Sequence, residues 1–167
     1  MPHSDLARLD RRLRFISLLA ILFSTMACSN ARTTLGTKPD PRTEGEMTFY
    51  RLDGDRYPGD PVAPGTELLH GYSAIEACGI EDRGTRAAIL EAFDAGIADH
   101  DRANTPAVDC FRPRHAIRIL QDGVTTDFLI CLECRNWYSW TDGEPSGGGG
   151  TSDAPRGTFD RILDDCR

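Results

Sequence analysis

The stretch Arg114-His-Ala-Ile-Arg-Ile-Leu-Gln-Asp-Gly-Val-Thr-Thr-Asp-Phe-Leu-Ile-Cys131 lies at the centre of the fold that this sequence predicts. Two runs rich in β-branched residues flank Asp122-Gly123. Asp-Gly between two such runs indicates a β-hairpin with a two-residue type I′ turn, because both turn positions need a positive φ that these residues tolerate. The turn pairs Gln121 with Val124, which fixes the register of both strands.

Charge and apolar pattern agree on this register. It places Arg118 opposite Asp127, a cross-strand pair of opposite charge. The apolar residues that fall on one face are Ile117, Ile119, Phe128 and Ile130. Because one face of a hairpin is usually buried, we expect these four side chains to point into the core.

The chain before the hairpin predicts two strands and a helix. Residues 46–52 alternate enough to form a strand, and residues 67–80 are expected to form a second one. Residues 53–65 are rich in Gly, Asp and Pro and predict a loop. Asp82 can cap a helix over residues 82–102, which has an alanine-rich composition and one apolar stripe.

The chain after the hairpin predicts one strand, a loop and a helix. Trp137-Tyr-Ser-Trp140 is typical of a short strand, and its aromatic residues are expected to pack in the sheet, with a binding platform as the alternative. Residues 141–157 contain Gly147–Gly150 and predict a mobile loop. Thr158 can cap a final helix over residues 158–165.

These elements predict a single small α+β domain. An antiparallel sheet with the central hairpin of about residues 114–131 would be covered by two helices, at about 82–102 and 158–165. The domain would span residues 46–167, a length that suits one modest core.

The N-terminal residues predict that the protein is exported from the cytoplasm. Residues 1–27 combine a cationic start with a short apolar run, which is typical of an export signal. Thr25-Met-Ala-Cys28 resembles a lipobox, the bacterial signal for lipid attachment to cysteine, so Cys28 is the expected lipidation site, carrying acyl chains such as palmitate. An ordinary cleaved signal or an uncleaved anchor, with Cys28 incidental, is the alternative.

The residues after Cys28 predict a membrane tether. Residues 28–45 are rich in Ser, Thr, Arg, Pro and Gly and cannot bury a core, so we expect a flexible tether. Ser29, rather than Asp, follows the lipidated cysteine. By resemblance to lipoproteins of bacteria with two membranes, this favours the outer membrane, facing the periplasm, over the inner membrane.

The net charge of the chain limits the kinds of molecule that it is expected to bind. The formal net charge is −7, and the first 27 residues hold four arginines against two aspartates, so the remainder carries −9. Such a chain repels nucleic acid, which excludes it as an expected partner. No phosphate-binding loop, nucleophile elbow or paired-carboxylate motif is present, and this favours a protein that is not an enzyme.

The densest group of residues that can bind a metal or react chemically consists of Cys110, His115, Cys131 and Cys134. Three thiolates and an imidazole suit tetrahedral zinc, so a zinc site is one interpretation. A redox pair of Cys131 and Cys134, with His115 lowering a thiol pKa, is another. Structural disulfides are the third, since exported domains allow them.

The disulfide interpretation has two parts. Cys110 would pair with Cys134 or Cys131, and Cys78 would pair with Cys166, which would tie the second strand to the last helix. The domain has five cysteines, so at least one thiol is free, metal-bound or reserved for chemistry.

Three segments of the chain resemble a family of bacterial proteins, many of them predicted lipoproteins. The segments are Cys110-Phe-Arg-Pro-Arg-His115, Ile130-Cys-Leu-Glu-Cys134 and Phe159-Asp-Arg-Ile-Leu163. His70-Gly71 also fits the pattern, whereas Leu132 departs from it and Cys78 and Cys166 are additions to it. The function of this family is unknown, so the resemblance implies no activity.

The sequence therefore predicts a lipid-anchored protein of the bacterial cell envelope. Its cysteine-stabilised domain would have a binding or structural role, and its partners would be the membrane, through the anchor, and other envelope proteins. The alternative is a zinc-binding or thiol-redox protein that uses Cys110, His115, Cys131 and Cys134.

Overall fold

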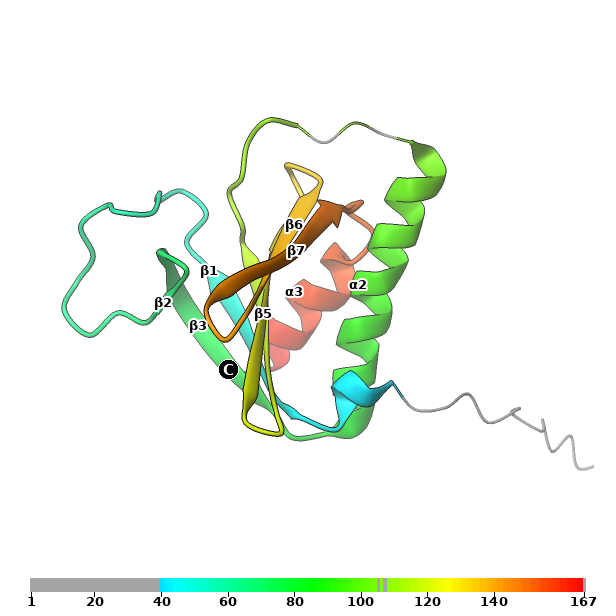
Figure 1. Cartoon of the computed structure of the whole chain (residues 1–167), viewed down its shortest axis with the longest axis horizontal. Coiled ribbons are helices and arrows are strands. Elements are labelled where there is room, and N and C mark those ends of the chain that lie inside the picture. The colour runs from blue at the N-terminus through cyan, green and yellow to red at the C-terminus, as the bar shows by residue number, and fades with distance from the viewer. Residues whose placement is uncertain (1–39, 105, 107, 167) are drawn as a thin grey trace, which may run out of the picture. The chain divides into compact units, whose positions relative to one another are not determined.

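The computed structural model describes residues 40–104, 106 and 108–166 (Figure 1). The elements in chain order are the 3₁₀ helix η1 (Pro41–Thr43), strands β1 (Glu46–Leu52), β2 (Leu68–Leu69) and β3 (Tyr72–Ile80), helix α2 (Arg83–Ala103), strands β4 (His115–Gln121), β5 (Val124–Cys131), β6 (Asn136–Thr141) and β7 (Glu144–Gly150), and helix α3 (Arg156–Asp165). The expected signal peptide and Cys28 lie outside the described residues.

The strands form one antiparallel sheet, in the order β2-β3-β1-β4-β5-β6-β7. The predicted α+β class with an antiparallel sheet and two helices is confirmed, although the sheet extends well beyond the central hairpin. In the described part of the chain, no helix is long and apolar enough to cross a bilayer.

The β4–β5 hairpin has the predicted register. Gln121 pairs with Val124 and Arg118 with Asp127, around a turn in which Asp122 and Gly123 both have positive φ, 53° and 81°. The apolar face is also confirmed, because Ile117, Ile119, Phe128 and Ile130 all belong to the main core or pack against it.

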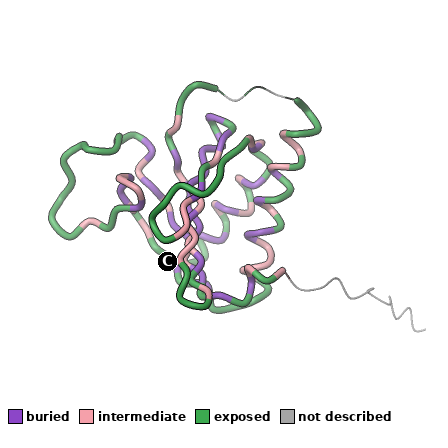
Figure 2. Tube along the Cα trace, in the orientation of Figure 1, coloured by how far each residue is buried: buried purple, intermediate pink, exposed green. Residues whose placement is uncertain are grey.

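Two hydrophobic clusters occupy opposite faces of the sheet, and Figure 2 shows buried residues on the strands and on both helices. The larger cluster joins one face to α2 and α3; its helical members are Ile89, Leu90, Phe93, Phe159, Ile162 and Leu163. The smaller cluster lies on the opposite face, called the helix-free face because no helix of the described residues contributes to this cluster; its members are Tyr50, Leu52, Leu69, Tyr72, Ala116 and Leu129. The helix-free face is therefore partly apolar.

The segment predicted as a single strand, residues 67–80, is a hairpin instead. β2 ends at Leu69 and β3 begins at Tyr72, which pairs with Leu69. His70 and Gly71 form the turn with positive φ of 49° and 90°. The strand prediction was wrong here because a His-Gly turn lacks the usual Asn or Asp signal.

Residues 141–157, predicted as a mobile loop, contain the ordered strand β7. Asp142 and Gly143 have positive φ and turn the chain from β6 into β7. The glycines that follow lie against aromatic rings: Gly148 against Tyr138, Gly149 against Trp137, and Gly150 against the imidazole of His100 on α2. These glycines therefore allow close packing against the rings, whereas a glycine-rich composition by itself suggests a flexible loop.

Substitution of Gly150 tests this packing. An alanine Cβ at this position would overlap the His100 ring, so Gly150→Ala is expected to lower the free energy of unfolding by about 1–3 kcal/mol. Gly157→Ala in α3 is the matched control, because its Cβ meets open space and alanine favours helix by up to about 1 kcal/mol. Urea unfolding followed by circular dichroism measures both; a neutral Gly150→Ala would contradict the packing role.

The helix predictions hold with one shifted boundary. Asp82 caps α2 by accepting a hydrogen bond from the backbone N–H of Thr85, and Asn104 ends the helix with a φ of 47°. α3 begins at Arg156, two residues before the expected cap, and its N-cap is Pro155 rather than Thr158. Thr158 is inside the helix because Pro, with a fixed φ, can start a helix without a capping side chain.

Ordered structure begins before the expected domain boundary at residue 46. Thr43 in η1 is buried, and Arg42 forms ion pairs with Asp40 and with Asp94 on α2. Residues 40–45 of the predicted tether thus pack against the domain, while residues 28–39 lie outside the described part.

Candidate functional site

Three of the predicted site cysteines meet at one end of the sheet. Cys131 is the last residue of β5, Cys134 lies in the tight turn that leads to β6, and Cys110 lies in the segment before β4. The Cα atoms of Cys110 and Cys134 are 5.6 Å apart, and those of Cys131 and Cys134 are 5.2 Å apart. Both separations lie in the range that a disulfide needs, so either neighbour can bond to Cys134.

The three thiols differ in exposure. Cys131 and Cys134 are each 1% exposed, whereas Cys110 is exposed to solvent. The backbone N–H of Cys134 donates to the sulfur of Cys131 over 3.1 Å, and the side-chain amide of Asn136 donates to the carbonyl oxygen of Cys110 over 3.0 Å. The cluster therefore has a buried side and a solvent side.

A cavity of about 380 Å³ opens beside the exposed cysteine. Its walls combine apolar and polar groups: Val108, Asp109, Cys110, Phe111, Asn136 and Tyr138. A space of this size accommodates a side chain or a small molecule rather than a large cofactor.

The fourth predicted ligand, His115, lies apart from the three cysteines. It faces α3, where its Nε2 lies 3.1 Å from a carboxylate oxygen of Asp160, and its ring packs against Phe49 and Phe159. By the alternation of β5, Cys131 belongs to the opposite face, together with Leu129. Within the described residues, no three His, Cys, Asp or Glu side chains are arranged to hold a metal ion.

His115 should make stability depend on pH. Burial lowers its pKa, although Asp160 partly opposes the shift. Folded His115 thus resists protonation, while the unfolded chain takes up a proton near pH 6.5, so stability falls as the pH drops below that value. The loss is no more than about 1.4 kcal/mol per pH unit. Urea unfolding at pH 7.5 and 5.5 should show a smaller drop for His115→Gln than for the wild type; equal drops would contradict the assignment.

Cys78 and Cys166 also lie as the sequence predicted. Cys78 is on β3, Cys166 ends α3, and their Cα atoms are 6.1 Å apart, within the range for a disulfide. The two cysteines connect the sheet to the last helix across 88 residues of sequence.

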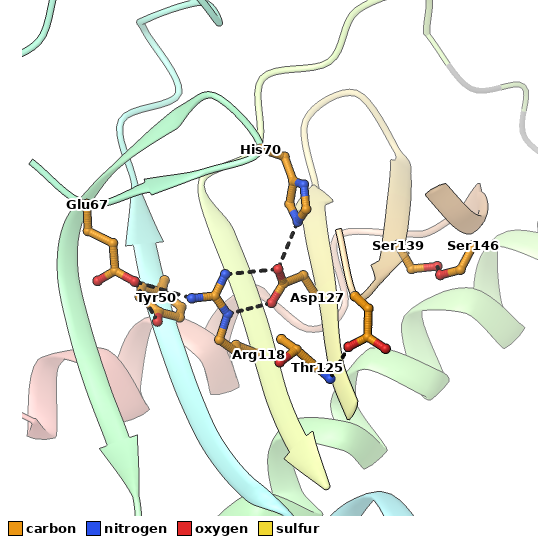
Figure 3. A network of polar contacts seen from close by, with 9 residues as sticks. Tyr50, Glu67, His70, Arg118, Thr125, Asp127, Ser139 and Ser146 are labelled. Atoms are coloured by element: carbon orange, nitrogen blue, oxygen red, sulfur yellow. Dashed lines mark hydrogen bonds and ion pairs between the residues drawn. The ribbon is translucent and has the colours of Figure 1, made fainter. Parts of the chain in front are cut away.

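A charged network occupies the helix-free face of the sheet (Figure 3). The carboxylate of Asp127, whose side chain is 5% exposed, accepts hydrogen bonds from Arg118 at 2.7 and 3.0 Å. Nε2 of His70 lies 2.8 Å from the same carboxylate. Arg118 reaches Glu67 at 3.4 Å, and Glu67 accepts from the hydroxyl of Tyr50 at 3.0 Å.

Contact between Arg118 and Asp127 favours the charged form of both residues. Burial disfavours the Asp127 carboxylate, but the hydrogen bonds from Arg118 and His70 outweigh burial and lower its pKa. The hydrogen bond with Asp127 raises the pKa of Arg118 in turn. The sequence predicted the pair of Arg118 and Asp127 but not His70, because the turn that carries His70 is remote in sequence.

Aromatic rings continue the network along the same face. The His70 ring stacks on Trp140 with centroids 4.1 Å apart. Phe111 contacts Tyr138 at 4.7 Å and Tyr72 at 5.8 Å, both edge-on. The three aromatic residues of β6 are divided between the two faces: Tyr138 and Trp140 lie on this one, whereas Trp137 packs against Phe93 of α2.

Comparison with known proteins adds no relative: no family model, curated protein or solved structure matches the chain. The fold and the site define a small α+β domain with a three-cysteine cluster and a charged, aromatic face. The resemblance to a bacterial lipoprotein family stays a prediction that rests on its motifs.

Proposed function

We propose that this chain is a lipid-anchored protein of the bacterial cell envelope whose domain binds an extended segment of an envelope protein. The binding would take place along the outer edge of β7, and the domain would have no catalytic role in it. Cys28 would hold the domain at the outer membrane, facing the periplasm.

The exposed edge strand β7 carries this proposal. Six of its seven residues are exposed, and it is the last strand of the sheet. Sheet edges are normally protected by charge, proline or a covering segment. In β7 such residues stand only at the start, as Glu144 and Pro145, and Ser146–Gly150 carry no charge. Its outward N–H and C=O groups suit an added strand.

Neighbouring side chains would supply specificity. Tyr138 on β6 pairs with Gly148 of β7, is 44% exposed and borders the cavity beside Cys110. An added strand would lie two strand spacings, about 9.6 Å, from β6. A long side chain on this face can still reach the Tyr138 ring, because the ring lies against Gly148, which has no side chain of its own. The net charge of the chain favours neutral or basic segments over acidic ones.

A peptide library drawn from envelope protein sequences tests the binding. Peptides that bind should slow hydrogen exchange at the β7 amides, because new hydrogen bonds cover its outer edge. Tyr138→Ser should weaken binding by about tenfold or more, as expected for an exposed aromatic anchor. Ile75→Ser is the matched control, since Ile75 is 63% exposed on β3. Absence of binders, or protection elsewhere, would refute the β7 site.

A second experiment tests the anchor independently. Cells expressing the wild type should incorporate labelled palmitate into the protein, and the protein should fractionate with membranes. Cys28→Ala should abolish the label and release the chain from the membrane. Retention of label in Cys28→Ala would exclude Cys28 as the lipidation site.

A further inference from the structure

We propose that Cys110, Cys131 and Cys134 form a thiol–disulfide exchange site that presents the Cys110 thiol to a disulfide substrate. This activity goes beyond the binding proposed above and does not depend on β7. It rests on the placement of three thiols around one sulfur and on the cavity at the exposed thiol.

Because a sulfur atom forms only one disulfide, Cys110 and Cys131 can exchange places as the partner of Cys134. The Cα atoms of Cys110 and Cys131 both lie within disulfide range of Cys134, at 5.6 and 5.2 Å, but one sulfur forms one disulfide. A cluster with a single disulfide therefore keeps one free thiol. That thiol is either the buried Cys131 or the exposed Cys110.

An internal exchange connects the two forms. The Cys131 thiolate attacks the sulfur of Cys134 in the Cys110–Cys134 disulfide; the Cys131–Cys134 bond forms, and Cys110 leaves as a thiolate. The number of disulfides is unchanged, so no oxidant or reductant is consumed. The N–H of Cys134, which donates to the Cys131 sulfur over 3.1 Å, stabilises negative charge on that sulfur in the first form.

The external step takes place at the cavity. The Cys110 thiolate attacks one sulfur of a substrate disulfide, a mixed disulfide with Cys110 forms, and the other half of the substrate leaves as a thiolate that takes a proton from water. The departing thiol can reverse the step. The cavity of about 380 Å³, with Phe111 and Tyr138 in its wall, has room for a small disulfide or for one disulfide-bonded side chain of a polypeptide.

This site differs from the redox pair considered from the sequence. That interpretation placed His115 beside the Cys131–Cys134 pair, but His115 lies on the helix-covered face with Asp160. The structure instead puts Cys110 in the exposed position, with its carbonyl oxygen held by Asn136.

Glutathione disulfide serves as the probe, added to the full-length chain purified after export. Peptide mapping should find glutathione on Cys110 of the folded wild type. In Cys131→Ser no internal thiol can release Cys110 from Cys134, so modification of Cys110 should slow by at least about tenfold. Ile75→Ser is the control, since Ile75 is 63% exposed on β3 and outside the cluster, and it should react at the wild-type rate.

Two results would overturn the proposal. In the first, Cys110 of the folded wild type never accepts glutathione, and a free Cys131 thiol is detected only after unfolding. This result would mean that Cys110 and Cys134 form a fixed structural disulfide. The other is native mass spectrometry showing zinc held by all three thiols, which means a metal site. Because both measurements use the wild type, they decide the matter even if Cys131→Ser does not fold.

Discussion

Replacement of both Cys78 and Cys166 by serine is expected to lower the free energy of unfolding by about 4–5 kcal/mol. The two cysteines are 88 residues apart in sequence, and their Cα atoms are 6.1 Å apart in the fold. A bond across so long a loop restricts the unfolded chain strongly, and this restriction is the main source of the stabilisation. The loss approaches the whole stability of a small domain.

The measurement is urea unfolding of the oxidised wild type and of the double variant, followed by circular dichroism. Reductant added to both proteins is the control, since it opens the Cys78–Cys166 bond in the wild type and any disulfide of Cys134 in both. Under reductant the stability difference between the two proteins should disappear. An oxidised wild type that unfolds like the double variant would show that Cys78 and Cys166 are not bonded.

Local signals account for the parts of the fold that could be predicted from sequence. The Asp122-Gly123 turn determines the β4–β5 register, and Asp82 and Asn104 mark the ends of α2. Each signal lies within a few residues of the feature it predicts. For this reason the hairpin and α2 were found with nearly correct bounds, and the α+β class followed.

Features that depend on distant contacts could not be predicted in this way. Gly147–Gly150 form a strand because aromatic rings of β6 and the His100 ring of α2 lie against them, and composition carries no trace of these contacts. The same holds for the candidate site. His115 and the three cysteines are close in sequence, yet the sheet separates His115 from them, while it brings His70 to Asp127 across 57 residues.

The second large effect is expected at Asp127. Asp127→Ala should lower the free energy of unfolding by about 3 kcal/mol. The substitution removes the partner that takes two hydrogen bonds from Arg118 and one from His70. Glu67, at 3.4 Å, and the Tyr50 ring, 5.9 Å below the guanidinium, remain as partners of Arg118, whose side chain is 32% exposed and so keeps some contact with water. We therefore place the effect at the lower end for a broken buried ion pair.

Two further variants test whether the loss of stability in Asp127→Ala comes from the broken ion pair with Arg118 rather than from removing a carboxylate in general. Asp99→Ala on the surface of α2 removes an exposed carboxylate that pairs with Arg102 at 3.6 Å, and its effect should stay within about 0.5 kcal/mol. The double variant Arg118→Leu, Asp127→Leu removes both charges and should lose less stability than Asp127→Ala alone. A double variant that is less stable than Asp127→Ala would contradict the loss of the main partner of Arg118 as the cause.

Acid supplies an independent test of the same carboxylate. The pKa of Asp127 in the folded protein lies below the ordinary value of 3.8, because the hydrogen bonds from Arg118 and His70 outweigh the opposing effect of burial. The unfolded chain therefore binds the proton first, and the contribution of Asp127 is complete above pH 3.8 and is lost as the pH falls through the folded pKa. The stability difference between the wild type and Asp127→Ala should thus be constant from pH 7 to 5 and shrink below pH 3.8. A difference that persists unchanged at low pH would show that Asp127 stabilises the fold by packing rather than by its charge.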